Sequence, residues 1–212
     1  MKPKVIIFDF WGTLAFFPMT DLKEFYSSLA RFGFKIKTEK EIKHFSSIFS
    51  RLMCFSKDWI DFSKQIFKEF VENPKKEKIV SFADFLKEKI IFEFYDDVKE
   101  VLNLPFKKVI LTNSARFLIE NLEPVQRFSK IFTPKETGFL KPDPKTFLSV
   151  LKKLKVKPKQ TIMVGDDIER DLMPAKDLKI KPVLIDRQNK FQDYPGLKIN
   201  SLKELKNILP GL

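Results

Sequence analysis

Apolar residues recur along the chain in two patterns, and each pattern predicts a different kind of structure. Residues 5–8 (VIIF) form a continuous β-branched and aromatic run, which is typical of a strand buried on both faces. Further runs of this kind lie at 108–111, 130–132, 161–164 and 182–185. Helical spacing is found at 96–102, 115–122, 144–154, 168–178 and 202–209, with Asp96 and Ser201 as capping residues. Strands that alternate with helices form right-handed βαβ units, so these segments predict an α/β fold with a parallel sheet.

The segment between residues 21 and 91 has the helical pattern alone. Its apolar residues recur every three or four positions, and breaks fall at Gly33, near Ser56-Lys57 and at Asn73-Pro74. This pattern predicts four helices and no strand, and a helical bundle of this size can bury its own core. We therefore expect an α/β core made of residues 1–17 and 93–212, interrupted by an all-helical insert of residues 18–92.

Polar residues follow directly after three of the predicted strands. They are Asp9, the group Thr112-Asn113-Ser114 and the group Gly165-Asp166-Asp167. In open parallel sheets the carboxyl ends of the strands meet at one rim, and ligands bind beyond it. Two carboxylates at one rim, those of Asp9 and Asp166, suit Mg²⁺, which prefers oxygen ligands. A carboxylate in such a place can also act as a nucleophile.

Lys141 is a candidate for charge neutralisation at the same rim. It precedes Pro142 and Pro144, which stiffen the loop and begin the next predicted helix. Phosphoryl transfer requires positive charge around the oxygens of the transferred group, and a lysine held in place supplies it.

Composition narrows the classes of function. The net charge of +12 suits a solvated basic surface or the attraction of anionic substrates such as phosphate esters. Nucleic-acid binding is not expected, because the lysines are spread along the chain without a recognition motif. His44 is the only histidine and lies in a helical stretch, which argues against Ser-His-Asp and Cys-His catalysis. Cys54 is the only cysteine, so an internal disulfide is excluded. No apolar run is long enough for a membrane helix, and a cytoplasmic protein is expected.

Four segments, in this order, resemble the four motifs of the haloacid dehalogenase (HAD) superfamily of hydrolases. They are Asp9–Leu14, Leu111–Ser114, Lys141–Pro144 and Gly165–Asp171. The family has an Asp followed by x-Asp-Gly-Thr-Leu, a Thr or Ser after a strand, a lysine in Lys-Pro-Asp-Pro, and Gly-Asp-x-x-x-x-Asp. The helical insert is similar to the family's cap of the first type. The resemblance spans nearly the whole chain and implies a Rossmann-like three-layer core with an inserted all-helical cap.

The resemblance also implies roles for the residues that bind substrate. Asp9 is identified as the nucleophile that forms an aspartyl-phosphate. Thr112, Asn113 and Ser114 are expected to hold the transferring group, with the backbone amide of Asn113 as one of the donors. Lys141 is expected to neutralise the charges of Asp9 and the substrate.

A second set of roles concerns the metal. By the resemblance, Mg²⁺ is bound by Asp9, by Asp166 and by the backbone carbonyl of Trp11. Asp171 is expected to orient metal-bound water or Lys141. Asp167 is either an additional ligand or an acid in the first turn of a helix, where the helix dipole favours negative charge.

The sequence departs from the family pattern at Trp11. Phosphatases of this superfamily usually carry a second Asp there, which protonates the leaving oxygen, and an indole cannot do that work near neutral pH. Three interpretations follow. The first is a phosphatase that acts on esters with good leaving groups, or that takes an acid from the cap or the substrate. The second is a 2-haloacid dehalogenase acting through an ester on Asp9. The third is a catalytically weak homologue that binds a ligand. Asp166 with Asp171 favours the metal enzyme, because dehalogenases dispense with magnesium.

The expected partner is accordingly a small phosphorylated metabolite, with no nucleic acid and no membrane. A monomer and a homodimer are both compatible with the sequence, since the many phenylalanines of the insert would fill either its own core or an interface.

Overall fold

The computed structural model describes residues 3–18 and 22–211, and the chain forms two compact units. The core unit comprises Met1–Phe16 and Phe94–Leu212, and the inserted unit comprises Phe17–Glu93. The division thus falls one residue from the borders expected at each crossing. That the inserted unit acts as a cap stays a prediction.

A six-stranded sheet forms the centre of the core unit. Its strand order is β5-β4-β1-β6-β7-β8. The strands are β1 (Val5–Phe8), β4 (Lys107–Leu111), β5 (Lys130–Phe132), β6 (Thr161–Gly165), β7 (Lys181–Ile185) and β8 (Leu197–Ile199). Every neighbouring pair is parallel, with Ile7 aligned to Val109 of β4 and to Met163 of β6. The predicted α/β class is therefore confirmed.

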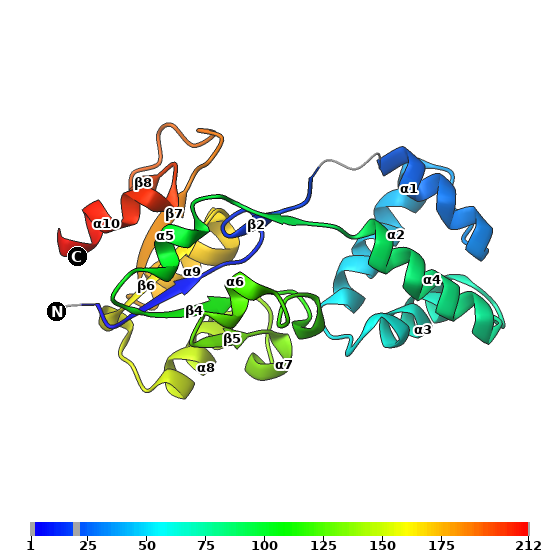
Figure 1. Cartoon of the computed structure of the whole chain (residues 1–212), viewed down its shortest axis with the longest axis horizontal. Helices are drawn as coiled ribbons and strands as arrows, with labels where there is room; N and C mark the ends of the chain where they lie inside the picture. The colour runs from blue at the N-terminus through cyan, green and yellow to red at the C-terminus, as the bar shows by residue number, and fades with distance from the viewer. Residues whose placement is uncertain (1–2, 19–21, 212) are drawn as a thin grey trace. The chain divides into compact units, whose positions relative to one another are not determined.

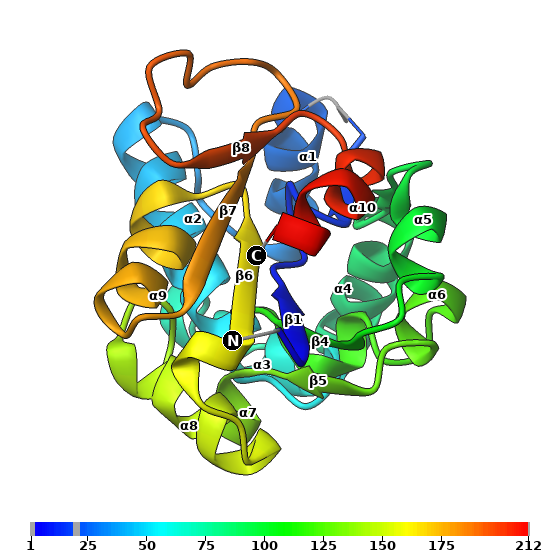
Figure 2. The same cartoon turned by 90° about the vertical axis from the view of Figure 1, so that its left-hand side faces the viewer.

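Helices cover both faces of this sheet. Figure 2 shows α8 (Pro144–Leu154) and α9 (Met173–Asp177) on one side and α5 (Val98–Leu102), α6 (Glu123–Gln126) and α10 (Leu205–Ile208) on the other. On the first side, Phe147, Val150 and Leu151 of α8 form one cluster with side chains of four strands, among them Phe132 of β5. The other strand residues are Val5, Ile7, Val109, Leu111 and Met163. Burying this apolar area is the main force that fixes the sheet and hence the ends of its strands.

Short helical segments complete the core unit. They are the 3-10 helices η2 (Arg116–Leu118), η3 (Pro158–Gln160), η5 (Leu202–Glu204) and η6 (Leu209–Gly211), the π-helix η4 (Ile168–Leu172), and α7 (Pro134–Thr137). Strands β2 (Ala15–Phe16) and β3 (Glu93–Phe94) form a separate two-stranded sheet. Sequence patterns predicted neither these two strands nor β8 and α7, because runs of two to four residues are too short to show a period.

The predicted helix over 115–122 is wrong. Only the 3-10 turn η2 forms there, because the Arg116 guanidinium donates to the Ile131 carbonyl at 2.8 Å and to Glu136 at 3.0 Å. These tertiary bonds outweigh local helical propensity. The predicted helix over 168–178 is split into η4 and α9, since Pro174 has no backbone N–H to continue the helical ladder.

Caps also differ in part from expectation. Helix α5 begins after Asp97 rather than Asp96, and the Asp97 carboxylate makes no capping bond. Ser201 does cap the last helical segment, where its hydroxyl accepts from the Lys203 N–H.

The inserted unit is helical, as predicted. Its elements are α1 (Leu22–Ser28), η1 (Leu29–Phe32), α2 (Glu39–Met53), α3 (Trp59–Phe70) and α4 (Lys76–Lys89), which Figure 1 shows as one group. Gly33 ends η1 in the left-handed conformation with φ 98°, and Thr38 begins α2 with a capping box.

Phenylalanine rings fill the interior of the inserted unit. Phe82 is fully buried, and its ring centroid lies 5.0 Å from that of Phe32, 5.1 Å from that of Phe34 and 5.4 Å from that of Phe67. Phe34 also contacts Phe45 at 5.5 Å. Many of these pairs meet edge to face, the arrangement that the quadrupole of an aromatic ring favours.

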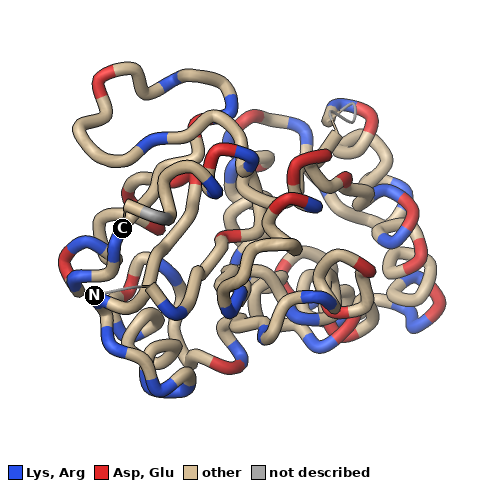
Figure 3. Tube along the Cα trace, turned by 60° about the vertical axis from the view of Figure 1, so that its left-hand side comes forward, with Lys and Arg blue, Asp and Glu red and all other residues tan. Residues whose placement is uncertain are grey.

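Charged residues are spread over both units. Figure 3 shows Lys and Arg along the trace of each unit, interspersed with Asp and Glu. In the described part of the chain, no helix has the length and apolar character needed to cross a membrane.

Candidate active site

Asp9 lies at the carboxyl end of a central strand. Its backbone N–H donates to the Val164 carbonyl of β6 at 2.9 Å, which continues the ladder beyond Phe8. All of Val5–Phe8 is buried, and Asp9 is only 8% exposed. The nucleophile predicted from the sequence therefore follows a buried strand that is paired on both sides, as a preorganised site requires.

A tight turn follows Asp9 and allows another carboxylate to approach. Gly12 has φ 74°, and a Cβ at this position would lie 2.1 Å from Asp166 Oδ2. Any side chain there would displace Asp166, so glycine is required for close approach as well as for backbone conformation. The Thr13 hydroxyl donates to Asp166 Oδ1 at 3.5 Å.

Lys141 connects two carboxylates of the site. Its Nζ donates to Asp9 Oδ1 at 2.5 Å and to Asp171 Oδ1 at 2.6 Å, and the residue is 5% exposed. Burial alone would lower the Lys141 pKa, but the charges of Asp171 and Asp9 outweigh burial and raise the pKa to about 12. The ammonium group is therefore charged throughout the physiological pH range.

The loop that carries Lys141 is fixed by Asn113. The Lys141 backbone N–H donates to Asn113 Oδ1 at 2.8 Å, and Asn113 Nδ2 donates to the Lys141 carbonyl at 2.9 Å. This paired contact joins the end of β4 to the lysine loop. The sequence predicted only a backbone donor at Asn113, because nothing local reveals a side-chain contact with a residue 28 positions away.

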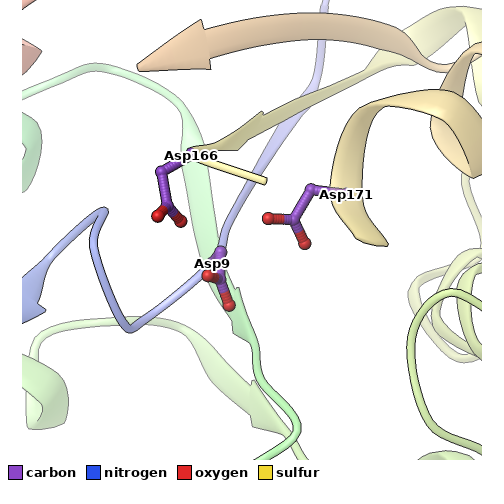
Figure 4. Close-up of side chains that lie close together, drawn as sticks. All are labelled: Asp9, Asp166 and Asp171. Carbon is purple, nitrogen blue, oxygen red and sulfur yellow. The ribbon is translucent and has the colours of Figure 1, made fainter. Parts of the chain in front are cut away.

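Three carboxylates converge at the rim. Oxygens of Asp9, Asp166 and Asp171 all lie within 4.8 Å of one another, and Figure 4 shows the three side chains turned toward a common space. Burial and then the negative charge of Asp9 raise the pKa of Asp166 to about 6 and that of Asp171 to about 7. One lysine does not compensate three carboxylates, so the group has an affinity for additional positive charge.

The donor set fits a divalent cation that prefers oxygen. Asp9 and Asp166 present carboxylates, and the backbone of Trp11 passes beside them at the wall of the same cavity. Asp171 Oδ2 is buried and has no hydrogen-bond partner among the described residues. Gly165 leaves the space that Asp171 occupies, since a Cβ there would lie 2.4 Å from that oxygen.

A cavity of about 180 Å³ lies over these groups. Its lining residues are Asp9, Trp11, Gly12, Thr112, Asn113, Lys141, Asp166, Asp167, Arg170 and Asp171. The structure thus brings together all the residues predicted for the site except Ser114. The Ser114 hydroxyl accepts instead from the Trp11 indole N–H, and its backbone N–H donates to Thr112 Oγ1 at 3.1 Å.

Asp167 stands apart from the three-carboxylate group. It caps η4 by accepting from the Arg170 N–H at 2.8 Å, and it pairs with the Arg170 guanidinium at 2.5 Å. Burial would raise the pKa of Asp167, but these Arg170 contacts hold it below its ordinary value. Arg170 also lines the cavity. The sequence did not predict it, because only the turn between Asp167 and Asp171 brings its side chain to the site.

Arg187 and Asp97 brace the turn after Asp9 and were also missed. The Arg187 guanidinium donates twice to Asp97 at 2.9 Å and once to the Thr13 carbonyl at 2.7 Å, and it lies 3.6 Å from the ring centroid of Tyr95. Asp97 also accepts from the Ser201 hydroxyl and the Leu202 N–H. Residues 90 positions apart give no local sequence signal for such a pair.

Comparison with known proteins places this site in context. Glyceraldehyde 3-phosphate phosphatase of Methanocaldococcus jannaschii is 36% identical over 90 residues, which is 40% of this chain and 39% of that protein. Phosphoserine phosphatase of Thermus thermophilus is 25% identical over 159 residues, 68% of this chain and 64% of that protein. The crystal structure of a HAD phosphatase from Thermococcus onnurineus matches 98% of both chains with a TM-score of 0.68 and 26% identity.

A family model supplies the broadest match. The model for haloacid dehalogenase-like hydrolases covers residues 3–179, which include every residue that lines the cavity. The chain therefore belongs to the haloacid dehalogenase-like hydrolases.

Proposed function

We propose that the protein is a magnesium-dependent phosphatase that acts on a small phosphorylated metabolite through an aspartyl-phosphate on Asp9. The observation that carries this proposal is the position of Lys141 Nζ, bonded to both Asp9 and Asp171 beside Asp166. A nucleophilic carboxylate, a fixed cation and further acidic groups for a metal are the parts that phosphoryl transfer requires. The names of the two curated relatives, both phosphatases of small phosphate monoesters, support the same reaction class.

Asp9 would attack the phosphorus atom of the bound substrate. Lys141 would hold Asp9 in position and attract the phosphate dianion, while Asp171 fixes the lysine from the other side. Thr112 already accepts from the Ser114 N–H, so its hydroxyl proton is directed elsewhere and would donate to a phosphate oxygen. Mg²⁺, held by Asp9, Asp166 and the carbonyl of Trp11, would neutralise negative charge on the transferring group.

A second candidate function, dehalogenation of 2-haloacids, is favoured by Trp11 alone. Cleavage of a carbon–halogen bond requires no proton on the departing halide, so an indole is tolerated at this position. The carboxylates of Asp166 and Asp171 favour the metal-dependent reaction instead, because a metal-free dehalogenase has no use for this uncompensated negative charge.

The test measures phosphate release from p-nitrophenyl phosphate, glyceraldehyde 3-phosphate and phosphoserine, with Mg²⁺ or with EDTA. We expect Mg²⁺-dependent release that Asp9→Asn abolishes. Asp177→Asn, an exposed carboxylate at the end of α9, is the matched control and should retain wild-type activity.

Two other results would replace this proposal. Chloride release from 2-chloropropionate in EDTA would establish the dehalogenase. Silence in both assays, with a normal melting curve and calorimetric binding of inorganic phosphate, would identify a homologue that binds a ligand without turnover.

A further inference from the structure

Trp11 lines the cavity, and contacts with neighbouring residues hold its side chain in a defined place. Its indole N–H donates to Ser114 Oγ, and its ring meets Phe10 edge to face with the centroids 4.8 Å apart. An indole N–H is a donor without acid–base function near neutral pH. The position two residues after the nucleophile therefore holds a fixed indole ring, which cannot donate a proton to a leaving group.

The other side chains that line the cavity already have partners or roles. Lys141 donates to two carboxylates, and Arg170 is paired with Asp167. An arginine does not release its proton, and the hydroxyl of Thr112 and amide of Asn113 titrate far from neutrality.

The carboxylates of the cavity are committed in the same way. Asp9 is the nucleophile and Asp166 faces the proposed metal site. Asp171 accepts from Lys141 through Oδ1, and its Oδ2 is buried against Gly165, away from a leaving group. Asp167 caps η4 and pairs with Arg170. Of the described residues that line this cavity in the core unit, none remains to protonate a departing oxygen.

We propose that the enzyme acts preferentially on phosphates whose leaving group departs as a stable anion, namely acyl phosphates and phosphoanhydrides, and only slowly on alkyl phosphate monoesters. This inference rests on the proposed phosphatase function and specifies the substrate class of the same site. It separates the protein from its relatives named for glyceraldehyde 3-phosphate and phosphoserine, whose phosphates are attached to alkyl oxygens.

The two steps balance without a general acid. In the first, an Asp9 oxygen forms a bond to phosphorus while the bond from phosphorus to the leaving oxygen breaks, and the electron pair stays on that oxygen. The leaving group departs as a carboxylate or a phosphate anion, which needs no proton at neutral pH. In the second, water attacks phosphorus and regenerates the Asp9 carboxylate. The two protons of the water leave with the product as dihydrogen phosphate.

The size of the preference follows from the missing proton transfer. General acid catalysis typically contributes about 10²–10⁴-fold in rate when the leaving group is a poor one. An alkoxide depends on that contribution and a carboxylate does not. We therefore expect kcat/KM for acetyl phosphate to exceed kcat/KM for glycerol 3-phosphate by at least about 100-fold.

The experiment is a leaving-group series measured with saturating Mg²⁺. Acetyl phosphate, pyrophosphate, p-nitrophenyl phosphate, phenyl phosphate and glycerol 3-phosphate are compared by kcat/KM, and the logarithm is plotted against leaving-group pKa. We expect a steep fall in the wild type. In Trp11→Asp, which restores a carboxyl at this position, the ratio of glycerol 3-phosphate to acetyl phosphate turnover should rise at least about 10-fold.

A second variant separates acid chemistry from packing. Trp11→Phe keeps an aromatic wall, removes the N–H to Ser114 and adds no acid, so the steep slope should remain. Melting curves with and without Mg²⁺ establish that each variant is folded. The wild-type slope decides the preference even where Trp11→Asp fails to fold.

The outcomes distinguish this inference from the function on which it rests. No phosphate release from any compound, acetyl phosphate included, overturns the phosphatase itself. Release from all compounds with a shallow slope leaves the phosphatase standing and overturns the preference. A folded Trp11→Asp enzyme with an unchanged steep slope overturns the assignment of that preference to Trp11.

Discussion

The two units of this protein bury different kinds of side chain. The core unit buries charged residues, among them Asp9, Asp97, Lys141 and Asp171. Within 22–93, the described part of the inserted unit beyond the 19–21 gap, the buried residues are apolar apart from Ser56 and Ser63. The core therefore uses its apolar layers to hold charges in fixed geometry, whereas the inserted unit uses aromatic rings to hold itself together.

This difference has an energetic meaning. Buried charges cost desolvation energy and are retained where they are paired or where they carry function. Buried phenylalanines contribute stability with no polar requirement. The buried charges of the core thus lower its stability but allow catalysis. Substitutions in the core should therefore change turnover or ion pairing, whereas those in the inserted unit should change apolar packing.

The largest expected effect is loss of turnover in the core. Asp9→Asn should lower kcat by about 10⁴-fold or more, since no other group can form the covalent bond to phosphorus. The same change removes one of three carboxylates that lie close together beside a single lysine, so the melting temperature should stay equal or rise. Phosphate release and calorimetry measure the two effects. A lower melting temperature would show that Asp9 has a structural role.

The second expected effect concerns the brace of the turn after Asp9. Arg187→Met leaves the buried Asp97 carboxylate unpaired and should lower the free energy of unfolding by about 3–5 kcal/mol, measured by urea unfolding. Adding Asp97→Leu to this variant should recover part of the loss. If the single variant loses less than about 1 kcal/mol, the pair is not a structural brace.

A loss of similar size should arise in the inserted unit by the opposite means. Phe82→Ala removes a fully buried ring that contacts several others, which should cost about 3–5 kcal/mol of unfolding free energy. Phe82→Leu is the matched control and should cost less, because it keeps most of the apolar volume. This loss should not vary with pH between 5 and 8, because neither phenylalanine nor alanine titrates.

A smaller effect depends on pH and metal. Asp166 has a raised pKa, so the folded protein binds protons more tightly than the unfolded chain, and stability should fall as the pH rises from about 4 to about 6. One pKa unit corresponds to about 1.4 kcal/mol, and partial exposure reduces the effect, so we expect about 1–2 kcal/mol.

Asp166→Asn isolates this effect from the other carboxylates. In EDTA, the melting temperature of the variant minus that of the wild type should grow between pH 4 and pH 7. Mg²⁺ should reduce the difference, because a cation compensates the wild-type charge. A difference that is constant with pH would mean that folding does not raise the pKa of the Asp166 carboxyl.

The smallest effect is expected on the surface of the inserted unit. Arg51 lies 3.6 Å from Glu69, and both side chains are largely exposed at 61% and 41%. Arg51→Met should change the free energy of unfolding by less than about 1 kcal/mol, as exposed ion pairs do. Compared with Arg187→Met, this substitution tests whether burial of the partner sets the cost of losing an arginine.

Local pattern predicted the elements whose form is decided locally. The strands at 5–8 and 130–132 and the helix at 144–154 are found where they were expected, because buried apolar runs and an N-terminal Asp143-Pro144 pair specify them. The helix over 115–122 was wrong because Arg116 makes its decisive contacts with Ile131 and Glu136. The pattern of apolar residues carries no information about such bonds.

The candidate site shows the same division. Asp9, Thr112 and Asp166 were found from their places after strands, since the sheet brings strand ends together. Lys141 was found from the proline-containing loop that precedes the 144–154 helix. The sequence did not predict three side-chain contacts: that of Asn113 with Lys141, that of Trp11 with Ser114 and that of Arg187 with Asp97. Each depends on side-chain geometry across long sequence separations, which only the folded chain reveals.

The central position of β1 has a consequence for the order of assembly during synthesis. Strand β1 is translated first, yet its neighbours β4 and β6 lie at 107–111 and 161–165. Chains leave the ribosome from the N-terminus, so the strand that carries Asp9 waits without either partner while more than a hundred residues are added. Over that interval the apolar VIIF run lacks both of the strands that pair with it, so the sheet cannot close around Asp9 until β6 has been made.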